Sequence, residues 1–147
     1  MKLYQFEKPP YLISTDRSLL DFTIIHGYLT RSYWSTGISL EMVKNAADNS
    51  LCFGVYHENT QIGFARLMTD YTISAYLADV FILEEYRGQG LSKWLMECIL
   101  SIPEIRKLRK MMLATKDAHG LYAKYGFRAL SDPSKYMELP LEGYRTF

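Results

Sequence analysis

Hydrophobic and polar positions follow two kinds of pattern along this 147-residue chain, one typical of strands and one typical of helices. Short apolar or alternating runs, typical of strands, cover residues 11–14, 51–57, 62–68, 75–83 and 111–115, with two shorter runs at 127–130 and 136–139. Apolar residues at helical spacing cover a segment from Thr15 or Asp16 to Gly27 or slightly beyond, and then 40–49, 88–100 and 118–125. Ser39 is expected to cap the second of these helices, Pro103 to stop the third, and Gly126 to end the fourth.

The order of these elements predicts a mixed α/β (α+β) fold. Three consecutive strands form an antiparallel meander, and one strand–helix–strand crossover adds a parallel neighbour. The run at 77–83 is apolar on both faces apart from Asp79, as is typical of a central strand covered on both sides. At this length the simplest organisation is one domain over residues 1–147, with a mostly antiparallel central sheet flanked by about four helices.

Composition and charge exclude some classes of function. The net charge of +1 provides no field that would recruit nucleic acid or an anionic membrane. Cys52 and Cys98 lie in apolar segments without the spacing of a metal site, so we expect free buried thiols in a reducing compartment and no metal. The N-terminal stretch lacks a signal-peptide core, and no apolar run reaches about 18 residues, so we expect a cytoplasmic protein.

A glycine turn, Arg87-Gly88-Gln89-Gly90, connects the apolar strand at 75–83 to the helix that follows. Such a loop points backbone N–H groups at one spot, and the helix dipole adds partial positive charge there. The turn therefore predicts a phosphate site that needs no dedicated lysine, although the glycines could also serve only to make a tight turn. Because the turn follows the fourth strand and not the first, a doubly wound dinucleotide-binding domain is disfavoured.

Two motifs resemble the landmarks of one family. Residues 87–92, Arg-Gly-Gln-Gly-Leu-Ser, resemble the Arg/Gln-x-x-Gly-x-Gly/Ala signature of the GNAT superfamily, the acyl-CoA-dependent N-acetyltransferases. Residues 122–127, Tyr-Ala-Lys-Tyr-Gly-Phe, resemble its second landmark, Tyr-x-Lys-x-Gly-Phe, and follow the first in the family's order about 30 residues later. The sequence departs from the signature at Ser92, where glycine or alanine is commonest, so a small hydroxyl must fit near the phosphates or point away.

The resemblance implies acetyl-CoA as the co-substrate, held largely by backbone groups. In the family the strand before the turn diverges from its neighbour and binds the pantetheine amides, while the turn cradles the pyrophosphate. A main-chain N–H near Ile82 would also stabilise the oxyanion of the attacked thioester. Arg87 either adds charge to a phosphate or is a solvated turn residue. The implied cofactor-binding residues are Phe81, Ile82, Leu83, Arg87, Gly88, Gln89, Gly90, Leu91, Ser92 and Lys124.

Two catalytic residues follow from the resemblance and from the strand itself. A phenol at Tyr122 could donate a proton or a hydrogen bond to the departing CoA thiolate, although Tyr122 also lies on a helical stripe that could simply be core. Many relatives place a glutamate early in the fourth strand as general base, and Tyr76 occupies that position here. Asp79 is either the base or a structural carboxylate bonded to backbone or a tyrosine, and Asp70 and a water chain stay open as well.

The acceptor side of the family's site is built by the N-terminal helices and the adjacent strands. Mapped onto this chain, its substrate-binding residues are Tyr33, Trp34, Arg66 and Asp70, and the two aromatic residues either form a binding wall or seal the core. We therefore expect an N-acetyltransferase that passes an acetyl group from acetyl-CoA to the primary amine of a small molecule or peptide, by direct attack in a ternary complex. The alternatives are a catalytically silent CoA-binding sensor and an acyltransferase with a longer donor. Homodimers are common in the superfamily.

Overall fold

The computed structural model describes residues 2–146 and divides between Leu113 and Ala114 into two compact units. The first unit contains a six-stranded sheet and the helices α1–α4, and the second contains the short helix α5. The strands are β1 (Gln5–Lys8), β2 (Tyr11–Ser14), β3 (Leu51–His57), β4 (Thr60–Thr69), β5 (Ser74–Ile82) and β6 (Lys110–Met112). The helices are α1 (Phe22–Leu29), α2 (Leu40–Asp48), α3 (Leu91–Ser101), α4 (Pro103–Arg106) and α5 (His119–Ala123), with 3-10 turns η1 (Arg17–Leu19), η2 (Glu84–Tyr86) and η3 (Pro133–Lys135).

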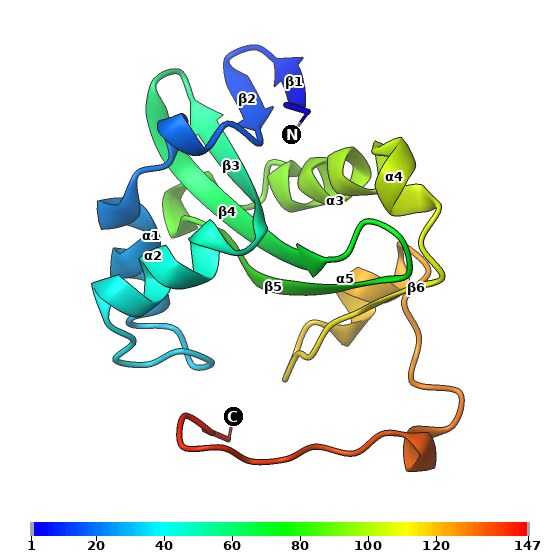
Figure 1. The fold of residues 1–147 in the computed structure, drawn as a ribbon. Coiled ribbons are helices and arrows are strands. Elements are labelled where there is room, and N and C mark those ends of the chain that lie inside the picture. The colour runs from blue at the N-terminus through cyan, green and yellow to red at the C-terminus, as the bar shows by residue number, and fades with distance from the viewer. Residues whose placement is uncertain (1, 147) are drawn as a thin grey trace. The chain divides into compact units, whose positions relative to one another are not determined.

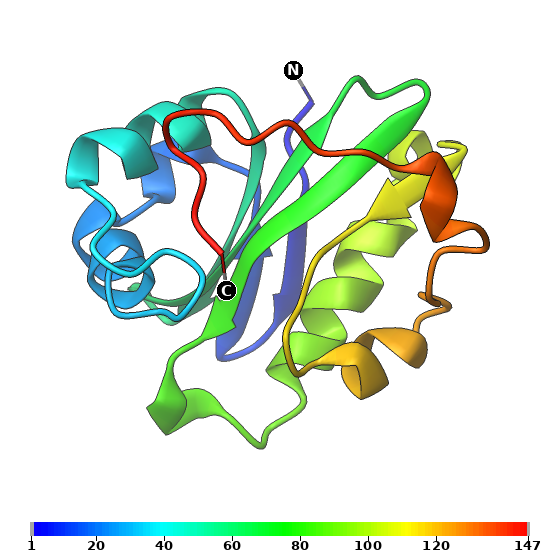
Figure 2. The same cartoon turned by 90° about the horizontal axis from the view of Figure 1, so that it is seen from below.

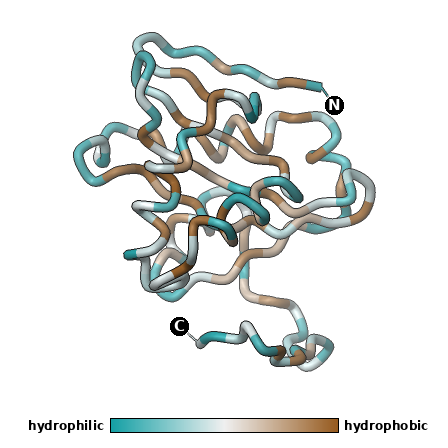
Figure 3. Tube along the Cα trace, turned by 60° about the vertical axis from the view of Figure 1, so that its left-hand side comes forward, coloured by the Kyte–Doolittle hydropathy of each residue, from teal (hydrophilic) through white to brown (hydrophobic). Residues whose placement is uncertain are grey.

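The sheet of the first unit is ordered β1-β2-β3-β4-β5-β6, and every neighbouring pair is antiparallel except β5 and β6. Helices α1 and α2 lie on one face of this sheet and α3 on the other (Figure 1, Figure 2). Hydrophobic residues gather along the strands, and hydrophilic ones occupy many of the turns between them (Figure 3). The predicted fold class, the meander and the parallel crossover are thereby confirmed.

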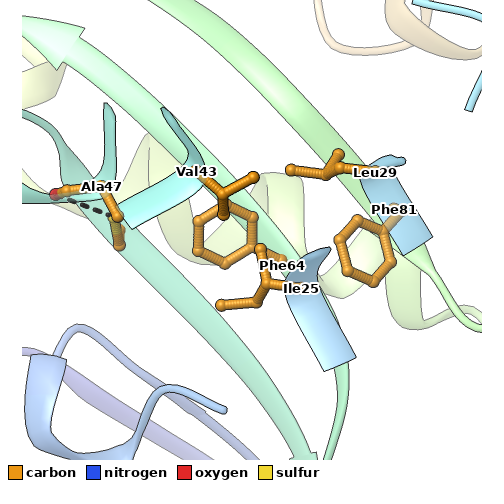
Figure 4. Close-up of a cluster of buried hydrophobic side chains, with 7 residues drawn as sticks. Ile25, Leu29, Val43, Ala47, Phe64 and Phe81 are labelled. Atoms are coloured by element: carbon orange, nitrogen blue, oxygen red, sulfur yellow. Dashed lines mark hydrogen bonds between the residues drawn. The ribbon is translucent and has the colours of Figure 1, made fainter. Parts of the chain in front are cut away.

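One core cluster fills the space between α1, α2 and the sheet (Figure 4). Each helix contributes two residues spaced four apart, which places them one turn above each other on the same face. The cluster consists of Ile25, Leu29, Val43, Ala47, Cys52, Phe64 and Phe81. Phe81 lies near the end of β5, so the same packing that holds the helices on the sheet also fixes the strand that leads into the glycine turn.

Helix α1 begins later than predicted, because a different aspartate caps it. The Asp21 carboxylate accepts hydrogen bonds from the N–H groups of Thr23 and Ile24, at 3.0 and 3.3 Å, directly before the apolar helical spacing. Asp16, one of the two predicted caps, accepts instead from the N–H of Ser18 and caps η1. The prediction for α2 is confirmed, since the Ser39 hydroxyl accepts from the N–H of Met42 at 3.1 Å.

Other elements also differ from their predicted bounds. Helix α3 starts at Leu91 and not at residue 88, because Gly88 and Gly90 have left-handed backbone that a helix cannot contain. Pro103 follows α3 as expected and is also the first residue of α4, where its missing N–H costs no hydrogen bond. Strand β6 and helix α5 are both shorter than the predicted 111–115 and 118–125.

Strand β1 has no counterpart among the predicted elements. It pairs antiparallel with β2, from Gln5 opposite Ser14 to Lys8 opposite Tyr11, and it forms an edge of the sheet. Phe6 is its only partly buried residue. A polar edge strand is held by backbone hydrogen bonds on one side and buries little, so it leaves almost no periodic apolar signal in the sequence.

The predicted strands at 127–130 and 136–139 are wrong. Between residues 124 and 146 the second unit contains η3 as its one regular element among the described residues. Met137 and Leu139 are 97% and 79% exposed, so the alternating pattern there has no buried face to match. A strand needs a paired backbone as well as an apolar pattern, and Pro133 and Pro140 remove two N–H donors from this stretch.

Candidate functional site

The outer edge of β5 is left open where β5 and β6 part. The two strands pair in parallel only from Ser74 opposite Lys110 to Tyr76 opposite Met112. Since β6 ends at Met112, the remainder of β5, up to Ile82, has no strand beside it on that edge within the described chain. Backbone N–H and C=O groups along this edge are therefore positioned to pair with an extended ligand.

Ile82, the last residue of β5, turns its backbone groups toward that open edge. It stands opposite Gly63 of β4, and the N–H of the next residue, Leu83, donates to the C=O of Ile62 at 2.8 Å. Ile82 and Gly63 are therefore a non-hydrogen-bonded antiparallel pair, and the N–H and C=O groups of Ile82 point away from β4. The Ile82 C=O accordingly accepts a hydrogen bond from the Arg87 side chain, and its N–H faces the same side.

The turn after β5 forms a backbone cradle at the start of α3. Gly88 and Gly90 have φ values of +79° and +80°, and a Cβ at either position would meet no atom within 4 Å, so the space in front of both is open. Gly90 is the N-cap of α3 and has no side chain to cover the first N–H groups of the helix. Those groups, with the helix dipole, give this end of α3 the partial positive charge on which the predicted phosphate site depends.

The Gln89 side chain does not occupy this cradle. Its Oε1 accepts a hydrogen bond from the Tyr11 hydroxyl at 2.7 Å, which ties the turn to β2. Leu91, the first residue of α3, is buried, whereas Ser92, the second, is partly exposed. The predicted strand, turn and helix are thus present in the predicted order, and the binding roles of residues 88–92 stay predictions.

The Arg87 guanidinium is held by three groups of the protein. Its Nε donates to the C=O of Ile82 at 3.0 Å, and its Nη2 donates to the Tyr28 hydroxyl at 2.6 Å and lies 3.9 Å from the Glu84 carboxylate. Glu84 is also gripped by both nitrogens of the Arg31 fork, at 2.6 and 3.1 Å, and this hydrogen bonding holds the pKa of Glu84 down at about 2. Arg87 is therefore engaged with the protein and is not simply a solvated turn residue.

Asp79 sits at a β-bulge that redirects its side chain. Phe64 pairs with Phe81 and Arg66 with Ala78, so β5 contains one more residue than β4 across this interval. Asp79 takes up the extra length with a φ of +56°, which is unusual for a residue other than glycine.

Both oxygens of the Asp79 carboxylate accept hydrogen bonds. Oδ2 accepts from Arg66 Nε at 2.8 Å, and Oδ1 accepts from Trp34 Nε1 at 3.0 Å. Arg66 also donates to the Ser50 hydroxyl at 3.2 Å, and the Arg66 and Asp79 side chains are only 15% and 11% exposed. A carboxylate that neutralises a buried guanidinium is poorly suited to accept a proton from a substrate amine. The geometry favours the structural alternative for Asp79, with Arg66 and Trp34 as its partners in place of backbone or a tyrosine.

Three of the four predicted substrate-binding residues lie in one cluster. Trp34 and Arg66 are joined through Asp79, and the Tyr33 ring meets the Trp34 ring edge-on, with centroids 5.1 Å apart. Asp70 has a different role. Its Oδ1 accepts from the N–H groups of residues 72, 73 and 74, at 2.7 to 3.1 Å, which closes the turn between β4 and β5 and lowers the pKa of Asp70.

Tyr122 and Lys124 belong to the second unit. Tyr122 is buried on α5, and its ring packs edge-on against Phe127 with centroids 5.7 Å apart. Lys124 is the exposed C-cap residue of α5, and Gly126 follows in the left-handed conformation, as the sequence predicts for the end of this helix. The catalytic role of Tyr122 and the cofactor role of Lys124 stay predictions.

Three residues of the site have no role in the sequence-based predictions. Ser50 supports Arg66, Glu84 pairs with Arg31 and Arg87, and Tyr28 contacts Arg87. Apart from the Glu84–Arg87 pair, which is three residues apart, these contacts join positions separated by 16 to 59 residues, and no local pattern in the chain signals them.

Residues 2–146 contain neither a metal-ligand cluster nor a membrane-spanning helix. No group of three or more His, Cys, Asp or Glu side chains is arranged to hold a metal ion. No helix in this part of the chain is long and apolar enough to cross a membrane.

The family of the chain follows from comparison with known proteins. A family model described as an acetyltransferase (GNAT) domain matches residues 48–129, which include β5, the glycine turn and α5. This chain therefore belongs to the GNAT acetyltransferase family. A curated relative named "Putative acetyltransferase FG08082", from Gibberella zeae, is 29% identical over 135 residues, covering 78% of this chain and 76% of the relative.

Solved structures agree with this assignment. The crystal structure of a protein from Xanthomonas campestris pv. campestris, described as a "putative acetyltransferase belonging to the gnat family", is 46% identical, with a TM-score of 0.88 over 93% of this chain and 97% of that one. A GNAT family acetyltransferase from Elizabethkingia anophelis, solved with acetyl-CoA bound, is 18% identical with a TM-score of 0.63, covering 82% and 78%. The second likeness shows a shared fold.

If Asp79 is structural, removing its charge should destabilise the fold. Asp79→Asn leaves the Arg66 guanidinium largely buried without its counter-charge, so it should lower the free energy of unfolding by about 3 kcal/mol in urea titrations. Asp48→Asn is the matched control, because its partner Arg17 is exposed and such a pair contributes less than about 1 kcal/mol. Equal, small losses in the two variants would contradict a structural role for the Arg66–Asp79 pair.

Proposed function

We propose that this protein transfers the acetyl group of acetyl-CoA to a primary amine by direct attack in a ternary complex. The observation that carries the proposal is the succession of two backbone surfaces: the open edge of β5 ends at Ile82, and the left-handed glycine turn follows after the short η2 segment. The first surface suits the amides of a pantetheine arm and the second suits a pyrophosphate. Acetyl-CoA contains both groups in one chain, next to its thioester.

Family membership supports the choice of acetyl-CoA as donor. The Elizabethkingia anophelis enzyme shares this fold and was solved with acetyl-CoA bound. In the chain described here, residues 81–83 and the backbone of residues 88–92 would hold the donor, with Ser92 near the phosphates. Cys52 and Cys98 are both free and buried, which is consistent with the reducing environment of a cytoplasmic protein.

The chemistry of the step places demands on particular groups. The amine lone pair attacks the thioester carbonyl carbon, and the N–H of Ile82, which faces the open edge, would donate to the oxygen as it gains charge. The C–S bond then breaks, and the Tyr122 hydroxyl would donate a proton or hydrogen bond to the departing CoA sulfur. The amine must also lose a proton. Since Asp79 is paired with Arg66 and Trp34, we propose that water accepts this proton in place of a buried carboxylate.

The acceptor would lie against the aromatic cluster of Tyr33 and Trp34. The Arg66–Asp79 pair behind this cluster is neutral overall, so the wall itself attracts neither anions nor cations strongly. The rings provide apolar contact area with one indole N–H already committed to Asp79. This arrangement favours an acceptor with an apolar body beside its amine.

The amine dependence of CoA release tests the proposed function. Acetyl-CoA is offered with a panel of aliphatic amines, aromatic-ring amines and short peptides, and the released thiol is measured. We expect turnover with at least one amine that carries an apolar group. Double-reciprocal plots of the initial rate should intersect when both substrates are varied, because both must be bound before the acetyl group is transferred. Tight acetyl-CoA binding without turnover on any amine would contradict this function and would favour a CoA-binding sensor.

Tyr122→Phe tests the assignment of the proton donor. Removing the hydroxyl should lower kcat about 100-fold, the usual contribution of a positioned acid, while the Kd for acetyl-CoA changes little. Tyr125→Phe, on the same segment, is the control and should retain the wild-type kcat. An unchanged kcat in Tyr122→Phe would remove Tyr122 from the mechanism.

A further inference from the structure

The Arg87 side chain directs its identified contacts into the protein. A guanidinium has five N–H donors in one rigid plane. In Arg87 the Nε donor is used by the Ile82 C=O at 3.0 Å and an Nη2 donor by the Tyr28 hydroxyl at 2.6 Å. The plane of the guanidinium is thereby fixed between the end of β5 and α1. This geometry differs from that of a side chain waiting in solvent for a phosphate.

Tyr28 is itself held firmly, so it can serve as a fixed anchor for Arg87. Its ring stacks on Phe81, with centroids 4.0 Å apart and the planes within 5° of parallel. The Arg31 guanidinium lies over the same ring, 4.6 Å from its centroid, and is forked onto Glu84 of η2. Tyr28 of α1 is thus linked through its ring to Phe81, and through its hydroxyl to Arg87 at the start of the turn. Arg87 in turn reaches Ile82, the last residue of β5.

These contacts fix the distance between the two backbone surfaces of the proposed donor site. Arg87 immediately precedes Gly88, the first left-handed residue of the turn, and its side chain reaches back to Ile82, the last residue of the open edge. Four residues, 83–86, separate the two, and the Arg87–Ile82 hydrogen bond closes that short loop. A ligand that spans both surfaces requires that distance to be constant.

We propose that Tyr28 and Arg87 form a positioning pair that holds the open edge of β5 in register with the phosphate-binding turn, and that Arg87 acts through its hydrogen bonds and not by placing its charge on the pyrophosphate. This inference rests on the proposed function, because it concerns the same acetyl-CoA site. It replaces both sequence-based alternatives for Arg87, a phosphate contact and a solvated turn residue.

Two substitutions at position 87 separate hydrogen bonding from charge. Arg87→Gln removes the charge but keeps an N–H that can reach the Ile82 C=O. Arg87→Lys keeps the charge but cannot bridge Ile82 and Tyr28 with one fixed plane. By isothermal titration with acetyl-CoA, we expect Kd to rise about fivefold in Arg87→Gln, the effect of one lost hydrogen bond, and more than about tenfold in Arg87→Lys. The salt dependence of Kd should be unchanged in Arg87→Gln.

Tyr28→Phe tests the other half of the pair, because it keeps the ring on Phe81 and removes only the hydroxyl. It should raise Kd about fivefold in the wild-type background and not at all in Arg87→Gln, since glutamine is too short to reach position 28. Tyr86→Phe is the control and should bind as the wild type does. Melting temperatures of all variants show whether each is folded.

Two results would overturn this inference while leaving the proposed function in place. The first has two parts: Arg87→Lys binds acetyl-CoA with the wild-type Kd, whereas Arg87→Gln has a Kd at least tenfold higher and a weaker salt dependence of Kd. That combination would indicate a charge contact between Arg87 and a phosphate. The other is an unchanged Kd in Tyr28→Phe. Failure of the wild-type protein itself to bind acetyl-CoA would overturn the proposed function and this inference together.

Discussion

The parting of β5 from β6 is the constraint on which the rest of the proposed site depends. The two strands share only three residue pairs, and beyond them the outer edge of β5 has backbone groups with no neighbouring strand among the described residues. Unpaired backbone groups are costly unless water, a side chain or a ligand satisfies them. One such group, the Ile82 C=O, is satisfied by Arg87. The others leave an edge that can pair with a ligand carrying amides of its own.

The surrounding residues keep this edge in a single conformation. Phe81 is buried in the core between the helices and the sheet, and it is stacked on Tyr28. The bulge at Asp79 bends β5 a little earlier, where the carboxylate is locked by Arg66 and Trp34. An open strand edge is therefore framed by a packed core, an aromatic stack and a mostly buried ion pair, which makes it a rigid surface in spite of its missing neighbour.

Local signals in the sequence were enough to predict most of the first unit. Alternation and apolar runs located β3, β4 and β5, Ser39 marked the start of α2, and the glycines at 88 and 90 marked the turn because only glycine tolerates φ near +80° there. Contacts between distant positions could not be predicted this way. Trp34 and Asp79 are 45 residues apart, and nothing near Asp79 distinguishes a structural carboxylate from a general base. The predictions for the polar strand β1 and for residues 136–139, which form no strand, failed for the converse reason, since strand pairing depends on a partner and not on the pattern.

The central claim is that the glycine turn and the adjoining edge of β5 hold acetyl-CoA, and a binding titration with Gly90→Ala tests it most directly. The added methyl group opposes a left-handed φ of +80° and faces the open side of the turn, so Kd should rise at least about tenfold. Gly27→Ala, in the exposed middle of α1 where a Cβ meets nothing within 4 Å, should bind as the wild type does. Wild-type affinity in Gly90→Ala, or no binding by the unaltered protein, would contradict the account.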